Sequence, residues 1–218
     1  MEQFPISIGK RRQGSRAASV ALNVILILLV LIIVFELTFF SRFKRFYVVG
    51  QSMYPTLTGA DYTYNSVGER IIEAGGDYVY ADTAATPQRG NIVVITTSNS
   101  GSLTTIIKRA IAFGGEKVEL VDGALYIDGA LIEEPYVSPE NNQSERNTYP
   151  ETLVPEGYVF VLGDNRDNSN DSRGDYGMIA LSDIVGVVPE WSMNMRGFIT
   201  PISTFFDFTL PSVFSGCN

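Results

Sequence analysis

One long apolar run near the start of the chain stands apart from the rest of the sequence. Residues 17–40 contain only four polar positions, and the twelve residues from Val24 to Phe35 are all apolar. As an α-helix, this stretch would be roughly 36 Å long, enough to cross a hydrocarbon core of about 30 Å. The pattern predicts a transmembrane helix over residues 17–40.

The residues around this helix indicate how it is used. Bulky and basic residues occupy 39–43, where a cleaved signal peptide would have small residues. We therefore interpret the helix as an uncleaved signal anchor, with a buried core helix as the alternative. Four basic residues precede the span and three follow it, which only slightly favours a cytoplasmic N terminus. Glu36 lies near the end of the span, where its carboxylate can reach the interface.

Beyond residue 46 the apolar positions occur in short runs between turns, as is typical of β-strands. Asp122-Gly123 and Asp128-Gly129 have the composition of tight hairpin turns. No long helical period is apparent after the anchor, so the predicted fold is mainly β: a single N-terminal transmembrane helix followed by an antiparallel β-sheet domain. The predicted strands are residues 77–81, 91–96, 103–112, 117–121, 124–127, 158–162 and 183–188.

Three stretches fit no strand. Residues 58–76 are mixed in character and are expected to form a loop or insertion, and the polar run 141–147 is expected to be mobile. The aromatic tail 198–214 is interrupted by Pro201 and Pro211. We expect this tail to pack on the domain rather than lie in a membrane interface.

The composition narrows the possible chemistry. The chain has no histidine, which excludes Ser-His-Asp and Cys-His catalytic groups and histidine-ligated zinc. The single cysteine, Cys217, excludes an intrachain disulfide. The net charge is -8, yet residues 1–45 hold seven of the 16 basic residues and only two of the 24 acidic ones. The remainder is strongly acidic, which argues against nucleic-acid binding.

Two segments carry candidate catalytic groups. Pro55 fixes a tight turn after Ser52, which can expose the serine hydroxyl and direct its backbone N–H at an oxyanion; an ordinary turn is the alternative. Strand alternation puts Lys108 on an apolar face with Ile106 and Ala110. Burial there, and the neighbouring positive charge at position 109, would lower the pKa of the lysine and make a neutral amine available as a base. A lysine snorkelling from a strand edge is the alternative.

A third segment, residues 163–173, is a polar loop with the sequence Gly-Asp-Asn-Arg-Asp-Asn-Ser-Asn-Asp-Ser-Arg. Its acidic residues and asparagines suggest a calcium site. However, Arg166 and Arg173 would compete with a cation, and the loop lacks the bidentate glutamate of a helix-loop-helix calcium site. We expect Asp171 and Arg173 to pair with each other.

In this order behind one anchor, the three segments resemble the motif boxes of bacterial type I signal peptidases (leader peptidases). The resemblance implies a Ser-Lys dyad serine protease in which Ser52 is the nucleophile and Lys108 the general base. It also implies that Ser169 hydrogen-bonds and orients the lysine. Asp171 and Arg173 would form a structural ion pair that shapes the site.

The resemblance covers roughly residues 46–188. It also has implications for the substrate cleft and for the substrates of the enzyme. Met53 would line the substrate cleft, whereas Gly50 stands where some members carry a hydroxyl for the oxyanion hole, so a second oxyanion donor is not assigned. Glu116 and Asn91 replace aspartates that are usual in the family. The implied enzyme removes signal peptides from exported preproteins and needs no metal or cofactor.

The implied domain organisation has three parts: a cytoplasmic segment 1–16, a transmembrane signal anchor 17–40, and an extracytoplasmic β-rich catalytic domain 41–218. The partners would be preprotein signal peptides and the lipid bilayer, without nucleic acid, and the sequence assigns no oligomeric state. Two alternatives stay open: an inactive or calcium-binding anchored β-domain, and a repressor-type self-cleaving Ser-Lys peptidase. The anchor and the absence of a DNA-binding helical domain count against the second.

Overall fold

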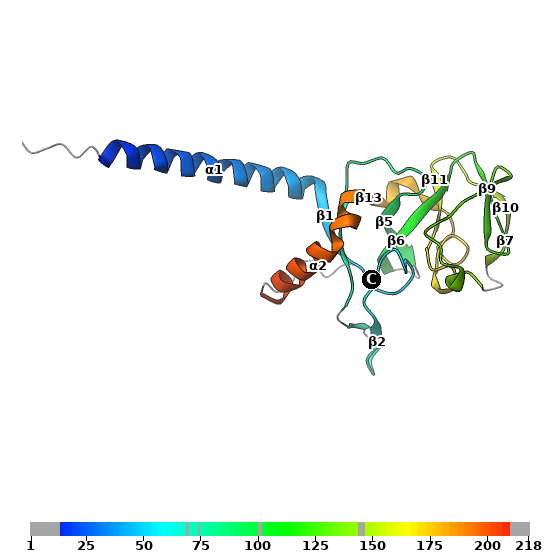
Figure 1. Cartoon of the computed structure of the whole chain (residues 1–218). Helices are drawn as coiled ribbons and strands as arrows, with labels where there is room; N and C mark the ends of the chain where they lie inside the picture. The colour runs from blue at the N-terminus through cyan, green and yellow to red at the C-terminus, as the bar shows by residue number, and fades with distance from the viewer. Residues whose placement is uncertain (1–13, 69, 74, 100–101, 144–146, 210–218) are drawn as a thin grey trace, which may run out of the picture. The chain divides into compact units, whose positions relative to one another are not determined.

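The computed structural model describes residues 14–68, 70–73, 75–99, 102–143 and 147–209 (Figure 1). The chain divides into two compact units, Met1–Arg42 and Phe43–Asn218. The described part of the first unit is a single helix, α1 (Gly14–Arg42). Its sequence contains no proline, and most of its side chains are apolar and do not compete for the backbone hydrogen bonds of the helix. The hydroxyl of Thr38 donates to Val34 O and Phe35 O without interrupting the helix.

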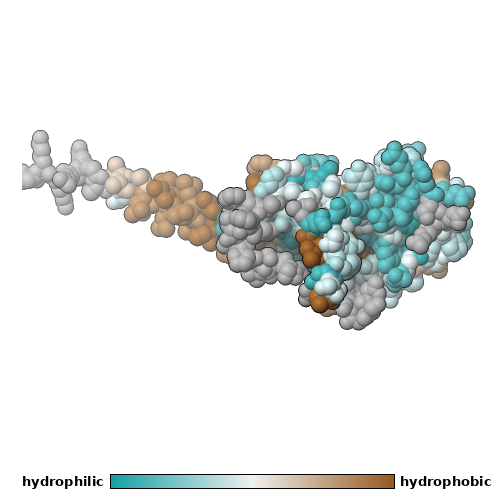
Figure 2. All heavy atoms as spheres, turned by 90° about the horizontal axis from the view of Figure 1, so that it is seen from below, coloured by the Kyte–Doolittle hydropathy of each residue, from teal (hydrophilic) through white to brown (hydrophobic). Residues whose placement is uncertain are grey.

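Helix α1 has the composition of a membrane span. Within it, Arg16–Arg42 is 27 residues long, and an 18-residue window of this segment has a mean hydropathy of 3.1. Each large apolar side chain from Val20 to Leu37 exposes at least 50% of its surface, and Figure 2 shows most of the helix as a continuous brown surface. Exposing so much apolar surface to water is unfavourable, so the composition of the helix favours a lipid environment.

The second unit consists of antiparallel strands in three sheets (Figure 1). A seven-stranded sheet has the order β1-β4-β13-β5-β6-β11-β12, a four-stranded sheet the order β10-β7-β8-β9, and β2 and β3 form a hairpin. The strands are β1 (Phe43–Tyr47), β2 (Tyr62–Tyr64), β3 (Arg70–Ile72), β4 (Tyr78–Asp82), β5 (Ile92–Asn99), β6 (Ser102–Phe113), β7 (Lys117–Val121), β8 (Ala124–Ile127), β9 (Ala130–Ile132), β10 (Tyr149–Leu153), β11 (Tyr158–Leu162), β12 (Ile179–Ala180) and β13 (Ile184–Val188).

The predicted mainly β fold is confirmed. All seven predicted strands are present, and β7, β8 and β11 have the predicted bounds. The turn between β7 and β8 forms as expected, because Asp122 (φ 48°) and Gly123 (φ 83°) both adopt the left-handed conformation of a two-residue hairpin turn. The short strands β1, β2, β3, β9, β10 and β12 were not predicted.

Strand β6 is the centre of the domain. It contributes Ile107 to one buried cluster, Ile111 to a second and Ile106 to a third. On one side β6 pairs with the whole length of β5, through the β6 residues from Ser102 to Arg109. On the other side β11 covers it only from Arg109 to Phe113. The segment before Arg109 therefore has one edge that β11 leaves open.

Helix α2 (Glu190–Thr209) corrects the expectation that no long helix follows the anchor. Strand β13 pairs with β4 only at Asp82, so the backbone N–H groups of Tyr78 and Tyr80 need other partners. Hydroxyl groups of α2 accept from both: Ser192 from Tyr80 (2.7 Å) and Thr200 from Tyr78 (2.9 Å). Contacts through hydroxyl groups do not require apolar residues at helical spacing, so the sequence lacks the pattern by which the helix could be predicted.

The structure describes parts of the stretches that were predicted to lie outside strands. Residues 58–76 contain the β2–β3 hairpin rather than a plain loop. In the run 141–147, Asn142 donates to Gly123 O and Asn147 is 1% exposed, and residues 144–146 lie outside the described residues. The expected mobility of this run stays a prediction. The tail belongs to α2 up to residue 209, with Ile199 buried and Phe198 exposed, and 210–214 are outside the described residues.

Candidate active site

A compact turn presents Ser52. The backbone N–H of Leu57 donates to Met53 O at 2.9 Å, and that of Tyr54 donates to Gln51 O at 3.2 Å. The side chains of Met53 and Leu57 are 1% and 0% exposed, so they fix the turn to the core. Among the described residues none accepts a hydrogen bond from the Ser52 N–H, which leaves this donor available to a substrate.

Lys108 lies beside this turn, although it is distant in sequence. Its Nζ is 2.8 Å from Ser52 Oγ and donates to Ile107 O at 3.0 Å. Burial lowers the pKa of Lys108 to about 8. The carboxylates of Asp171 and Asp164 have the opposite effect, but it is smaller. A group with this pKa is neutral in about one tenth of molecules at pH 7. The structure therefore brings a serine hydroxyl together with an amine that can act as a base.

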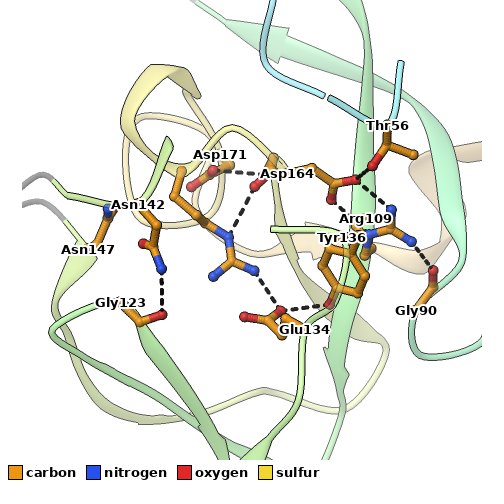
Figure 3. A network of polar contacts seen from close by, with 12 residues as sticks. Thr56, Gly90, Arg109, Gly123, Glu134, Tyr136, Asn142, Asn147, Asp164 and Asp171 are labelled. Carbon is orange, nitrogen blue, oxygen red and sulfur yellow. Dashed lines mark hydrogen bonds and ion pairs between the residues drawn. The ribbon is translucent and has the colours of Figure 1, made fainter. Parts of the chain in front are cut away.

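The expectation that Arg109 helps to lower this pKa is wrong. The pleat of β6 directs Arg109 away from Lys108, and its guanidinium binds Asp164 through Nε (2.8 Å) and Nη2 (2.5 Å). The charge of Arg109 is compensated in this pair, so burial alone lowers the pKa of the lysine. Asp164 also accepts from Thr56 Oγ1 at 2.5 Å, and it thereby joins the turn that carries Ser52 to the strand that carries Lys108 (Figure 3).

The polar loop after β11 also holds the backbone of the serine turn. Asn165 donates through its N–H to Ser52 O (3.1 Å) and through Nδ2 to Gln51 O (3.1 Å). A Cβ atom on Gly163 would lie 2.3 Å from Ser169 Oγ and 2.4 Å from Ser52 O. Only glycine fits between the two serines, so this close approach explains the residue that begins the loop.

Ser169 lies next to the dyad but does not make the expected hydrogen bond to Lys108. Its Oγ is buried, and none of the described atoms meets hydrogen-bond geometry with it. The hydroxyl is close enough to Asp171 to favour the charged form of that carboxyl.

The expected pair of Asp171 and Arg173 is confirmed. Arg173 donates from Nε to Asp171 Oδ1 and from Nη2 to Oδ2, both at 2.9 Å, and the two side chains expose 8% and 0% of their surface. Burial opposes ionisation of Asp171, but the guanidinium and the N–H of Gly163 hold its pKa below the ordinary value. Arg173 also donates to Asn147 Oδ1 (2.6 Å) and Arg166 O (2.9 Å), so the pair closes the loop on itself.

Sequence reasoning also missed the part of the supporting network around Glu134. Glu134 accepts from Arg166 Nη2 and from the Tyr136 hydroxyl, both at 2.6 Å, and the Tyr136 ring lies against Arg109 (Figure 3). Arg166 was noted only as a competitor for a cation. Nothing in the sequence around Glu134 and Tyr136 distinguishes them from ordinary loop residues.

An open cleft of about 520 Å³ runs past the dyad. Its walls are the segment from Tyr47 to Met53, the open edge of β6, the β2–β3 hairpin with Asp61, and the side chains Asn168, Asn170 and Tyr176. Gly50 lies in this wall with φ 78°, a conformation that glycine adopts without strain. The cleft is thus a groove beside an unpaired strand edge rather than an enclosed pocket.

The calcium alternative loses two of the three loop carboxylates on which it rested. Asp164 is paired with Arg109, and Asp171 is paired with Arg173. Within the described ranges, no group of three or more His, Cys, Asp or Glu side chains is arranged to hold a metal ion. The alternative of an inactive domain is also disfavoured, because the two candidate catalytic groups are within hydrogen-bond distance.

Comparison with known proteins agrees with this geometry. Residues 19–191 match the family model described as signal peptidase, peptidase S26. Signal peptidase I T of Bacillus subtilis is 36% identical over 155 residues, which are 66% of this chain and 70% of that protein. Signal peptidase I U of the same organism is 31% identical over 191 residues, 85% of this chain and 91% of that protein.

Among solved structures, a crystal structure of a signal peptidase I from Enterococcus faecalis is 34% identical, with a TM-score of 0.41, over 48% of this chain and 98% of that one. The family model covers most of the chain, and the two B. subtilis proteins exceed 30% identity over more than two thirds of their own length. The chain therefore belongs to the S26 family of signal peptidases.

Proposed function

We propose that this protein is a membrane-anchored serine endopeptidase that removes N-terminal signal peptides from exported preproteins. The observation that carries the proposal is the 2.8 Å contact between Lys108 Nζ and Ser52 Oγ beside an open cleft. Membership of the S26 family supports the substrate class, since the B. subtilis relatives are signal peptidases.

Acylation follows from the positions of these two groups. Neutral Lys108 takes the proton of the Ser52 hydroxyl while Oγ attacks the carbonyl carbon at the end of the signal peptide. The Ser52 N–H donates to the oxyanion that forms. As the peptide C–N bond breaks, the Lys108 ammonium returns its proton to the leaving amine, which becomes the N terminus of the mature protein.

Deacylation uses the same base in a second half-reaction. Water loses a proton to Lys108 as its oxygen attacks the ester carbon on Ser52. The C–O bond to Ser52 then breaks, and Oγ regains a proton from the lysine. The signal peptide leaves as a carboxylic acid, which loses its proton to the solvent, and both side chains return to their starting states.

The open edge of β6 supports a mode of substrate binding. β11 leaves the segment before Arg109 uncovered, and the cleft includes Thr104 to Lys108 of this edge. An extended signal peptide can add to such an edge as a further strand, with alternate side chains directed into the cleft. We propose that small side chains are selected at the first and third positions before the cut, as in the family.

For the topology, we propose that residues 1–16 are cytoplasmic, 17–40 cross the membrane and 41–218 form the extracytoplasmic catalytic domain. The exposure and hydropathy of α1 support the span. This arrangement puts the dyad on the side where signal peptides emerge after translocation.

The test is processing of a purified preprotein by the full chain in detergent micelles, read by N-terminal sequencing of the product. We expect one new N terminus, at the signal-peptide junction, and none with Ser52→Ala. A matched preprotein with phenylalanine at the position before the cut should be processed at least tenfold more slowly. Cleavage at scattered sites, or equal cleavage of both preproteins, would contradict the proposed specificity.

A further inference from the structure

Tyr136, which lies outside the cleft, covers the guanidinium of Arg109. The distance from Arg109 Cζ to the centre of the Tyr136 ring is 3.7 Å, which is close for a cation–π contact (Figure 3). The Tyr136 hydroxyl donates to Glu134 at 2.6 Å, and Glu134 accepts from Arg166 at 2.6 Å. The side chains of Glu134 and Arg166 expose 8% and 0% of their surface, so the ring is attached to a buried ion pair.

The other contacts of Arg109 all lie at the edges of its planar guanidinium. Two go to Asp164, and Nη1 donates to Gly90 O at 2.6 Å. Hydrogen bonds at the edges of a planar group restrict its movement in the plane, but they restrict tilting less. The Tyr136 ring occupies the face of the group and supplies this missing restraint.

The position of Arg109 matters because it is connected to both members of the dyad. Lys108 is its neighbour on β6, and Asp164 connects it to Thr56 on the turn of Ser52. We propose that Tyr136 is a positioning residue for the Ser52–Lys108 pair, acting through Arg109, with Glu134 holding the ring by its hydroxyl group. This inference rests on the proposed function, since the dyad is what Tyr136 positions.

A second consequence concerns the charge around Lys108. The carboxylates of Asp164 and Asp171 raise the pKa of Lys108, and both are compensated by arginines. If the Tyr136 ring is removed, Arg109 can tilt away from Asp164, whose charge then acts more strongly on the lysine. The pKa of Lys108 rises, so a higher pH is needed to obtain the neutral amine.

The hydroxyl of Tyr136 is suited to this role at every working pH. Burial and the charge of Glu134 raise its pKa well above the ordinary value, so it remains a protonated donor. The pH dependence of a Tyr136 variant therefore reports on Lys108 and not on the tyrosine itself.

The experiment compares kcat, KM and the pH profile of preprotein cleavage by the full chain and its variants. Tyr136→Leu is expected to lower kcat by about 10- to 100-fold, with KM nearly unchanged and the acid limb at higher pH, because the dyad is misplaced. Tyr136→Phe keeps the ring and should lose less, about fivefold. Tyr158→Phe and Glu133→Gln, two exposed positions with no part in the network, are the matched controls and should equal the wild type.

A double variant tests the link to Glu134. If the hydroxyl acts by holding the ring against Glu134, then Tyr136→Phe combined with Glu134→Gln should lose no more than the larger single loss. If the loss of kcat in the double variant equals the product of the two single losses, the hydroxyl group does not act through Glu134.

Two results would overturn the positioning role itself. One is wild-type kcat in Tyr136→Leu. The other is a loss of kcat in Tyr136→Leu that a smaller folded fraction explains fully, while the acid limb of the pH profile stays at the wild-type pH. If Tyr136→Leu does not fold, the acid limb of the pH profile is measured for Tyr136→Phe and Glu134→Gln instead. An acid limb at the wild-type pH in both variants would overturn the positioning role. Failure of the proposed function would differ from all of these, since the wild type itself would then not process the preprotein.

Discussion

Replacing Ser52 by alanine, or Lys108 by alanine or methionine, is expected to lower kcat for preprotein cleavage by about 10⁴- to 10⁶-fold, as for other nucleophile–base pairs. Each change removes one partner of the 2.8 Å contact, and the chain has no histidine to replace the base. Lys108→Arg should fail to the same extent, because a guanidinium does not lose its proton in the working pH range. Cleavage by Lys108→Ala within tenfold of the wild type would show that another group takes the proton.

Lys108→Met separates catalysis from folding. The folded-state pKa of Lys108, about 8, is below the ordinary value of 10.5, so the unfolded chain binds the proton more tightly. The charged lysine therefore destabilises the fold below pH 8, and this penalty disappears as the pH rises from 8 to 10.5. Methionine fills the same space without a charge, so the melting temperature at pH 7 should equal or exceed that of the wild type.

Asp171→Ala is expected to lower the free energy of unfolding by about 3–5 kcal/mol, because it leaves the buried Arg173 without its ion-pair partner. For a chain of this size, the melting temperature of the full chain in detergent should fall by roughly 10 °C. Activity should fall as well, since Asp171 also fixes Gly163 between the two serines by accepting its N–H at 3.0 Å.

The pair of Lys117 and Glu151 provides a matched control. Its N–O distance, 2.8 Å, is similar, but the two side chains expose 53% and 51% of their surface. Glu151→Ala should therefore leave the melting temperature nearly unchanged. A chelator should leave the wild-type melt unchanged, whereas a calcium site would be destabilised by it. If Asp171→Ala lowers the melting temperature no more than Glu151→Ala does, the buried pair does not hold the loop.

The parts of the site that could be predicted from sequence are those with local signals. An apolar run, alternating strands and an Asp-Gly turn determined α1 and the core strands, and the order of three segments identified Ser52 and Lys108. The pairing of Asp171 and Arg173 was also accessible, because the two residues are close in sequence and opposite in charge. Apart from the order of the three segments, each of these features depends on residues within a few positions of one another.

The parts that could not be predicted depend on contacts between distant segments. Helix α2 uses hydroxyls to satisfy N–H groups of β4 over a hundred residues earlier, which leaves no periodic pattern. The role of Arg109 was misjudged because its partner Asp164 lies 55 residues later. For the same reason, Glu134 and Tyr136 gave no signal.

The central claim is that burial keeps Lys108 neutral often enough to activate Ser52, and the pH dependence of kcat/KM tests it most directly. The substrate should be a preprotein without groups near the cut that titrate between pH 6 and 9. Below the pKa of Lys108, kcat/KM should rise about tenfold per pH unit, and it should level off above a midpoint near 8. A rate that is flat from pH 6 to 9, or a midpoint near the ordinary lysine value of 10.5, would contradict the account.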